Sequence, residues 1–162
     1  MTDNIKIAVD AMSGENSPEK IIEGIKISLE TNKNNFFYIY GKKDILEEII
    51  QKYPTIKGHH EVIHANDIIA DNESPLVAAK KGKESSMWKA IESQKEKKTD
   101  ISLSAGNTGA LLVISRLILN SIEGINKPAL AALWPNQRDT NLVLDLGANI
   151  KCDEKNLVDF AC

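Results

Sequence analysis

The amino-acid sequence predicts an α/β protein with a largely parallel sheet and helices on both of its faces. Short runs of β-branched and aromatic residues alternate along the chain with longer segments whose apolar residues recur every three or four positions. Strands that alternate with helices of this length favour a parallel sheet, because parallel neighbours need a long crossover connection. The chain has 162 residues, 42% hydrophobic and 27% charged, which is typical of a soluble domain with one core.

Six short segments have the composition of strands. They are residues 5–10, 36–40, 61–64, 101–104, 130–134 and 142–145. Ser17 and Pro18 follow the first, and we expect them to be the N-cap and the first-turn residue of a helix. Further helices are expected over residues 45–53, over most of 75–97, after Gly106 and from residue 153 onward.

Residues 60–64 fit the His-Glu-x-x-His pattern of zinc proteases, but we reject this interpretation. The zinc pattern requires a helix, which would place His60 and His64 on one face around the metal. Here the β-branched pair Val62 and Ile63 occupies a strand position in the alternation, so that neighbouring side chains point to opposite faces.

The loops that leave the strands are the first candidates for a functional site, because ligands of open α/β sheets collect at the carboxyl ends of strands. Three such loops combine glycine with polar side chains: residues 10–16, 104–109 and 145–149. If their strands belong to one parallel sheet, the three loops open at the same edge. Candidate ligand-binding residues in the first and third loops are Asp10, Gly14, Gly147 and Asn149. Each could orient a ligand or serve only its own turn.

The loop over residues 104–109 gives the strongest physical argument for a binding site. Gly106 and Gly109 flank Asn107 and Thr108, so the backbone can turn tightly and point amide N–H groups outward at the start of a helix. Free helical N–H groups and the helix dipole favour phosphate or a developing oxyanion. The alternative is a plain glycine turn in which Asn107 or Thr108 is the N-cap. The loop is neither a P-loop nor a dinucleotide-binding Gly-x-Gly-x-x-Gly turn.

A basic cluster precedes Ser86 in an otherwise acidic chain. Lys80, Lys81 and Lys83 could hold a phosphate or attract an acidic protein, or they could simply form an exposed helix face.

Several classes of function are disfavoured. The formal net charge of -3 argues against nucleic acid as the main ligand. The segment 1–4 lacks the features of a secretion signal, and no apolar run is long enough to span a bilayer, so we expect a cytoplasmic protein. Cys152 and Cys162 are expected to be reduced thiols without a metal or nucleophilic role. The last helical pattern stops abruptly, as if the chain were cut short.

Five segments together resemble the bacterial phosphate acyltransferase family, PlsX. They are residues 7–16 (IAVDAMSGEN), 85–87 (SSM), 104–112 (SAGNTGALL), 127–131 (KPALA) and 144–149 (LDLGAN). Their order and spacing match the amino-terminal half of that family across nearly the whole chain, so we expect residues 1–162 to be the amino-terminal part of one α/β domain whose carboxyl-terminal half is absent. Ser13 and Glu15 stand where the family usually has Gly and Asp, and Gly82 replaces a usual basic residue before Lys83.

The resemblance implies transfer of a fatty acyl group from acyl carrier protein to inorganic phosphate, which gives acyl phosphate for phospholipid synthesis. It also implies a three-layer α/β/α fold similar to isocitrate and isopropylmalate dehydrogenases, a homodimer, and peripheral association with a membrane glycerol-phosphate acyltransferase. It implies no metal or other cofactor.

Our hypothesis for the site assigns Asn107, Thr108 and Lys83 to catalysis, and Asp10, Gly14, Ser86, Gly106, Gly109, Gly147 and Asn149 to substrate binding. Two other functions stay open. A dehydrogenase of the related fold would need a nicotinamide-binding fingerprint, which the sequence lacks. An inactive carrier-protein-binding or dimerisation fragment is the other alternative, and the nearly continuous apolar segment 111–119 gives it some support.

Overall fold

The computed structural model describes residues 4–162. Residues 1–3, which contributed to the argument against a secretion signal, lie outside the described part. The chain divides into two compact units, the first ending at Leu119 and the second spanning Asn120–Cys162. Within residues 4–162, no helix combines the length and the apolar character needed to cross a membrane.

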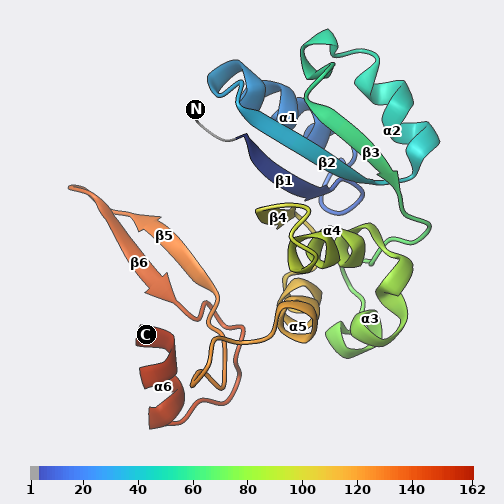
Figure 1. Cartoon of the computed structure of the whole chain (residues 1–162). Coiled ribbons are helices and arrows are strands. Elements are labelled where there is room, and N and C mark those ends of the chain that lie inside the picture. The colour runs from blue at the N-terminus through green and yellow to red at the C-terminus, as the bar shows by residue number, and fades with distance from the viewer. Residues whose placement is uncertain (1–3) are drawn as a thin grey trace. The chain divides into compact units, whose positions relative to one another are not determined.

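The first unit is built on a four-stranded sheet with the order β3-β2-β1-β4 (Figure 1). The strands are β1 (Ile5–Asp10), β2 (Asn35–Gly41), β3 (His60–His64) and β4 (Ile101–Ser104). All three neighbouring pairs are parallel. The predicted parallel sheet is therefore confirmed, and the four strands lie within two residues of the predicted bounds.

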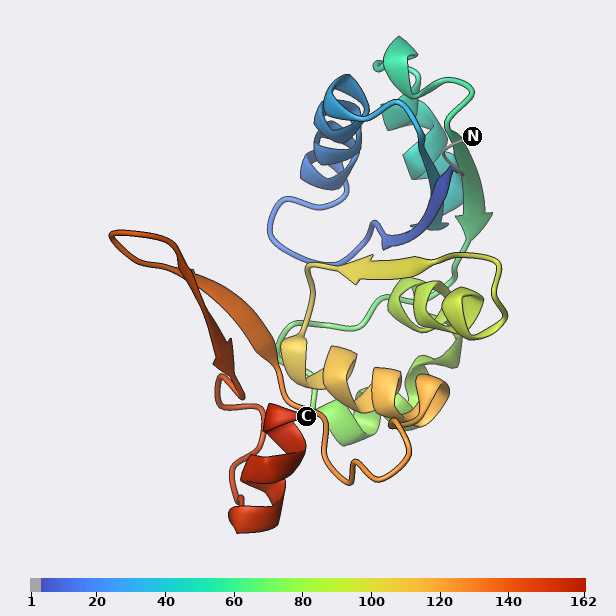
Figure 2. The same cartoon turned by 60° about the vertical axis from the view of Figure 1, so that its left-hand side comes forward.

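Helices cover both faces of this sheet (Figures 1 and 2). The helices α1 (Glu19–Thr31) and α2 (Lys43–Ile50) share one apolar core with the sheet, in which Ile22, Ile39 and Leu46 are fully buried. On the other face, Ala90 of α4 (Ser86–Lys95) packs against Ala8 and Tyr40. The helices α3 (Pro75–Lys81) and α5 (Thr108–Leu119) pack with α4 around a further apolar cluster.

One local prediction in this unit is wrong. Helix α1 begins at Glu19 with Pro18 at the N-cap position, and Ser17 does not cap it, because the Ser17 hydroxyl donates to the carbonyl of Ser13 instead (2.6 Å). The segment 75–97 is mostly helical, as predicted, and consists of α3, a short 3-10 helix (Gly82–Glu84) and α4. The division has a physical cause, since Ser85 adopts an extended backbone and caps a new helix by accepting from the amide of Trp88.

The second unit contains a β-hairpin and one helix. Strands β5 (Ala131–Pro135) and β6 (Thr140–Leu144) pair antiparallel, and α6 (Glu154–Ala161) follows. The condition that all three loops follow strands of one parallel sheet is therefore not met, because β6 pairs with β5 outside that sheet. The reason is the connection over residues 136–139, which suffices for a hairpin but is far too short for the crossover that a parallel pair needs. Asp153 caps α6 through a capping box with Asn156.

Candidate functional site

The order of the strands reverses once in the four-stranded sheet. From β1 the chain moves outward through β2 to β3, and it then returns to the other side of β1 to form β4. Asp10 and Ser104 are register partners, so β1 and β4 end at the same level. In open α/β sheets, ligands bind in the crevice outside such a switch point. Two of the three predicted loops, residues 10–16 and 104–109, meet there.

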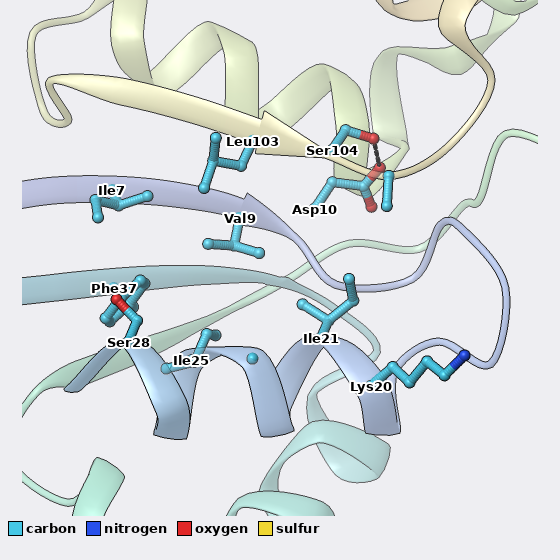
Figure 3. A pocket seen from close by; sticks show the side chains of 12 residues that line it. Ile7, Val9, Asp10, Lys20, Ile21, Ile25, Ser28, Phe37, Leu103 and Ser104 are labelled. Carbon is cyan, nitrogen blue, oxygen red and sulfur yellow. Dashed lines mark hydrogen bonds between the residues drawn. The ribbon is translucent and has the colours of Figure 1, made fainter. Parts of the chain in front are cut away.

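A short chain of hydrogen bonds joins the two strand ends. The hydroxyl of Ser104 donates to Oδ2 of the fully buried Asp10 (2.7 Å; Figure 3), and the amide of Met12 donates to Oδ1 (3.2 Å). Ser104 Oγ also accepts from the amide of Gly106 (3.2 Å). Asp10 thus fixes both its own loop and, through Ser104, the beginning of the loop after β4.

The glycines predicted for the site are required by close packing between these two loops. Gly14 has a φ of +97°, and a Cβ there would lie 2.8 Å from Cβ of Ala105. A Cβ on Gly106 would lie 2.5 Å from Cβ of Ser13 and 3.2 Å from the terminal methyl of Met87. A side chain at either position would push the two loops apart.

Asn107 holds the turn with its whole side chain. Its Oδ1 accepts from the amide of Ala110 (3.0 Å), and its Nδ2 donates to the carbonyls of Asp71 and Glu73 (2.9 Å each). This is the N-cap alternative of the sequence argument, with an added tie to the loop before α3. The side chain of Asn107 is therefore engaged within the protein. A catalytic role for Asn107 stays a prediction, and this role would be exerted through the position of the turn.

The backbone of the same turn keeps free donors. Because Asn107 Oδ1 satisfies Ala110, the amides of Thr108 and Gly109 are left in the first turn of α5, and they pair with no acceptor within residues 4–162. Thr108 is exposed. Gly109 lies against α3, because a Cβ there would be 2.7 Å from Cγ of Pro75. Free amides at the start of a twelve-residue helix favour an anion.

Two buried serine hydroxyls have no hydrogen-bond partner within the described residues. They belong to Ser13, which is 2% exposed beside Gly106, and to Ser86, which is fully buried in the first turn of α4. A buried hydroxyl without a partner is unfavourable, so such groups are uncommon and call for an explanation such as a bound molecule. Ser86 was among the predicted residues, and Ser13 was not.

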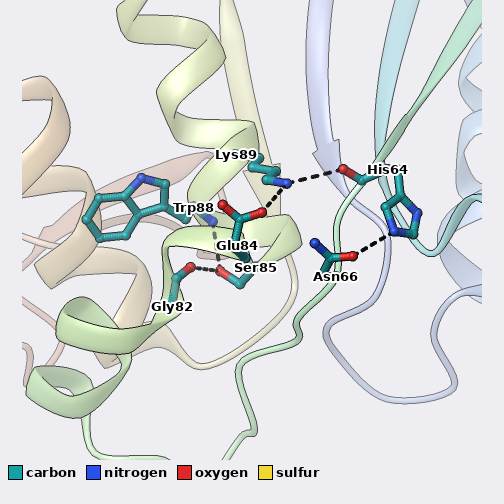
Figure 4. Close-up of polar contacts among 7 residues, drawn as sticks. All are labelled: His64, Asn66, Gly82, Glu84, Ser85, Trp88 and Lys89. Carbon is teal, nitrogen blue, oxygen red and sulfur yellow. Dashed lines mark hydrogen bonds and ion pairs between the residues drawn. The ribbon is translucent and has the colours of Figure 1, made fainter.

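A polar network ties the start of α4 to the end of β3 (Figure 4). The ammonium of Lys89 contacts Oε2 of Glu84 (2.8 Å) and donates to the carbonyl of His64 (3.4 Å). His64 Nε2 pairs with Oδ1 of Asn66 (2.9 Å). The hydrogen bond from Lys89 is the main cause that lowers the pKa of the Glu84 carboxyl. The network positions Ser85 and Ser86 relative to the strand ends.

The basic cluster lies next to this network. Lys80 and Lys81 are in the last turn of α3, and Lys83 is in the following 3-10 helix. All three side chains are exposed, and within residues 4–162 none of them forms an ion pair. They are available to an anionic ligand or partner.

Gly147 and Asn149 belong to the second unit. Gly147 has a φ of +80°, and Nδ2 of Asn149 donates to Oδ1 of Asp145 (2.9 Å) and to the carbonyl of Pro128 (3.0 Å). These contacts organise a local turn. Their strand, β6, is not part of the sheet that carries Asp10 and Gly106, so a shared strand-end site with these two residues stays a prediction.

The rejected zinc pattern lies on β3, so the prediction of a strand there is confirmed. Among residues 4–162 no cluster of His, Cys, Asp or Glu has the composition of a metal site.

Sequence reasoning missed two residues of the switch point, Ser13 and Ser104. Ser104 could have been found from the strand register, because equal strand ends place it opposite Asp10. Ser13 carried no sequence signal, since its importance rests on being buried without a partner.

Fold and strand-end loops place this chain in the class of parallel α/β proteins whose polar groups gather at a switch point. A sequence model described as fatty acid synthesis protein matches residues 5–162. The chain belongs to this family, which is the PlsX family.

Curated relatives agree with this assignment. A phosphate acyltransferase of Pelagibacter ubique is 56% identical over 161 residues, which cover 99% of this chain and 48% of the relative. Phosphate acyltransferases of Xanthobacter autotrophicus and of Rhodopseudomonas palustris (strain TIE-1) are 37% and 39% identical over 162 residues, covering 99% of this chain and 46% of each relative. The chain spans about half the length of the curated relatives it matches.

Proposed function

We propose that the protein is a phosphate acyltransferase that moves a fatty acyl group from acyl carrier protein to inorganic phosphate. The observation that carries this proposal is the match to phosphate acyltransferases over 99% of the chain. The family's role in fatty acid synthesis supports the acyl substrate. We further propose that residues 1–162 act as the amino-terminal part of one α/β domain in a cytoplasmic homodimer that associates peripherally with a membrane glycerol-phosphate acyltransferase.

The reaction requires an oxygen of phosphate to attack the carbonyl carbon of the thioester. A tetrahedral oxyanion forms, the C–S bond breaks, and the thiolate of the carrier leaves and takes up the proton that phosphate gives up. The products are acyl phosphate and the free thiol of the carrier. The site must therefore hold one dianion and stabilise one developing oxyanion, and it needs no covalent intermediate on the protein.

The amides of Thr108 and Gly109 and the hydroxyl of Ser13 supply donors for these charges. Asn107 keeps the turn in place from the side of α3, and Asp10 does so through Ser104. In this assignment Asn107 and Asp10 are positioning residues, since the structure engages their side chains with the protein. Asp10 is suited to this role because a bare carboxylate in direct contact with phosphate would repel it.

Lys83 and Ser86 take the remaining roles. The exposed Lys80, Lys81 and Lys83 attract the acidic carrier protein or phosphate, in agreement with their lack of ion pairs. Ser86 supplies a buried hydroxyl at the start of α4. Gly147 and Asn149 are further substrate-binding residues in this proposal.

The test uses the natural polypeptide that carries this sequence, incubated with long-chain acyl carrier protein and phosphate. Acyl phosphate measured by mass spectrometry is the expected product, and its absence would end the proposal.

Asn107→Ala should lower the rate by more than ~10-fold, chiefly through a higher KM for phosphate, because the free amides lose their fixed position. Asn72→Ala, an exposed residue in the neighbouring loop, is the matched control.

A further inference from the structure

An apolar groove of about 330 Å³ lies between α1 and the sheet, on the face opposite α4 (Figure 3). Its apolar walls come from β1, β2, β4 and α1 and consist of Ile7, Val9, Phe37, Leu103, Ile21 and Ile25. The volume falls within the roughly 300–1,000 Å³ typical of small-molecule sites. The groove belongs entirely to the first unit.

The groove exists because α1 leaves part of the sheet uncovered. Ile101 and Leu103 of β4 are 44% and 49% exposed, whereas Ile7 and Val9 of β1 are buried. Gly24 lies in the middle of α1 and lines the groove, and a Cβ built there would meet nothing within 4 Å. Glycine is unfavourable inside a helix. At this position its effect is to keep space open along the groove.

One end of the groove opens at the switch point. Asp10, Ser104 and Ala105, which join the two strand-end loops, line that end, and Lys20 lies near it in the first turn of α1 (Figure 3). Ile7, Phe37 and Ser28 lie at the other end. A molecule in the groove would therefore place its head beside Ser104 and Lys20, where the loops after β1 and β4 begin, and its tail among apolar side chains.

We propose that this groove binds the alkyl chain of the acyl group, with the reacting carbonyl at the strand ends; this inference rests on the proposed function. Three observations select an alkyl chain with an anionic head. The walls are apolar, the open end lies where the loops after β1 and β4 begin, and Lys20 supplies positive charge on the side of α1. Each methylene that the groove buries should strengthen binding roughly fourfold.

The test measures binding without turnover, so its result is independent of whether acyl phosphate forms. Octyl, decyl and dodecyl phosphate, below their micellar concentrations, are titrated by calorimetry into the natural polypeptide. We expect affinity to rise roughly fourfold per methylene until the groove is full. In the series Gly24→Ala, Gly24→Val and Gly24→Phe, affinity for dodecyl phosphate should fall as the new side chain grows, by at least ~10-fold for Gly24→Phe, while octyl phosphate is less affected.

Three further variants separate an effect on the groove from failure to fold and from an effect on the head group. Leu103→Trp blocks the groove from the sheet side and should reproduce the effect of Gly24→Phe. Ile27→Phe adds the same ring at a 53% exposed position of α1 outside the groove and should leave the chain-length dependence intact. Lys20→Met should weaken all three probes by a similar factor, because it acts on the head.

An unchanged chain-length dependence in Gly24→Phe and Leu103→Trp would overturn the proposal. The same holds if these variants only lower the melting temperature, since another protein segment would then fill the groove. A protein that binds dodecyl phosphate in the groove but forms no acyl phosphate would refute the proposed function and leave the groove assignment standing.

Discussion

The two units of the chain differ in how far their apolar side chains are buried. The first unit contains three clusters of buried apolar side chains. In the second, the residues that are buried are Asn156 and Asp159, while Leu133, Trp134 and Ile150 are 72%, 60% and 97% exposed. An isolated two-stranded hairpin is marginally stable in water. The parallel α/β part therefore builds an apolar core of its own, whereas residues 120–162 form none.

Polar contacts give the second unit its local form. The ammonium of Lys127 donates to the carbonyl of Lys151 (2.8 Å) and to Oδ1 of Asn156 (3.0 Å), and the amide of Asn126 donates to Oδ2 of Asp159 (3.0 Å). Such bonds each contribute about 1 kcal/mol net, so they shape a turn but cannot replace a core. The strand-end site therefore rests on the unit that has an apolar core.

The largest expected contrast comes from matched truncations of apolar residues. Ile39→Ala removes a fully buried side chain from the first unit and should lower the free energy of unfolding by about 2–5 kcal/mol. Leu142→Ala removes a 63% exposed side chain from the hairpin and should change it by less than about 0.5 kcal/mol. Denaturant titrations measure both. Equal losses would show that the hairpin has a core of its own and would break the comparison.

A smaller contrast is expected between two helix caps. Ser85 accepts from the amide of Trp88 (3.2 Å) in the first unit, and Asp153 accepts from the amide of Asn156 (2.9 Å) in the second. Ser85→Ala should lower global stability by about 1 kcal/mol. Asp153→Ala should leave the global transition nearly unchanged and instead speed hydrogen exchange over residues 154–161. A global loss from Asp153→Ala as large as that from Ser85→Ala would contradict this account.

The smallest effect concerns pH. Burial raises the pKa of the Tyr40 hydroxyl, which lies between the sheet and α4. A group whose pKa is raised on folding stabilises the protein below its unfolded pKa, and this contribution is lost as pH rises through the folded value. Unfolding free energy should therefore decrease above about pH 10, and Tyr40→Phe should make that decrease shallower. An identical alkaline profile in the variant would show that Tyr40 is not responsible.

Much of the first unit could be predicted from sequence, because its signals are local. The alternation of β-branched runs with apolar stripes found all four parallel strands, and glycine beside polar residues found the two loops at the switch point. The family assignment and the rejection of the zinc pattern were also within reach. The strand, loop and zinc-pattern predictions rest on periodicity and turn chemistry, which act over a few residues, whereas the family assignment rests on the resemblance of five segments.

The failures arose where long-range contacts decide. The sequence could not show that the Ser17 hydroxyl turns back to Ser13, whereas the pairing of β6 with β5 could have been expected from their short connection. Asn107 was correctly located in the turn, but its ties to the carbonyls of residues 71 and 73 depend on the tertiary fold. The groove beside Gly24 was likewise invisible, because a glycine in a helix does not reveal what it faces.

We propose that phosphate meets the acyl group at the carboxyl ends of β1 and β4. Two serines of β4 test this proposal most directly. Ser104 donates to Asp10 at the end of β4, whereas Ser102, two residues earlier, donates to Gln94 (2.7 Å) away from that end. Initial rates of acyl phosphate formation are measured against phosphate concentration in the natural polypeptide. We predict that Ser104→Ala lowers kcat/KM for phosphate at least ~10-fold and that Ser102→Ala changes it less than about twofold. Equal rates in the two variants would contradict the account.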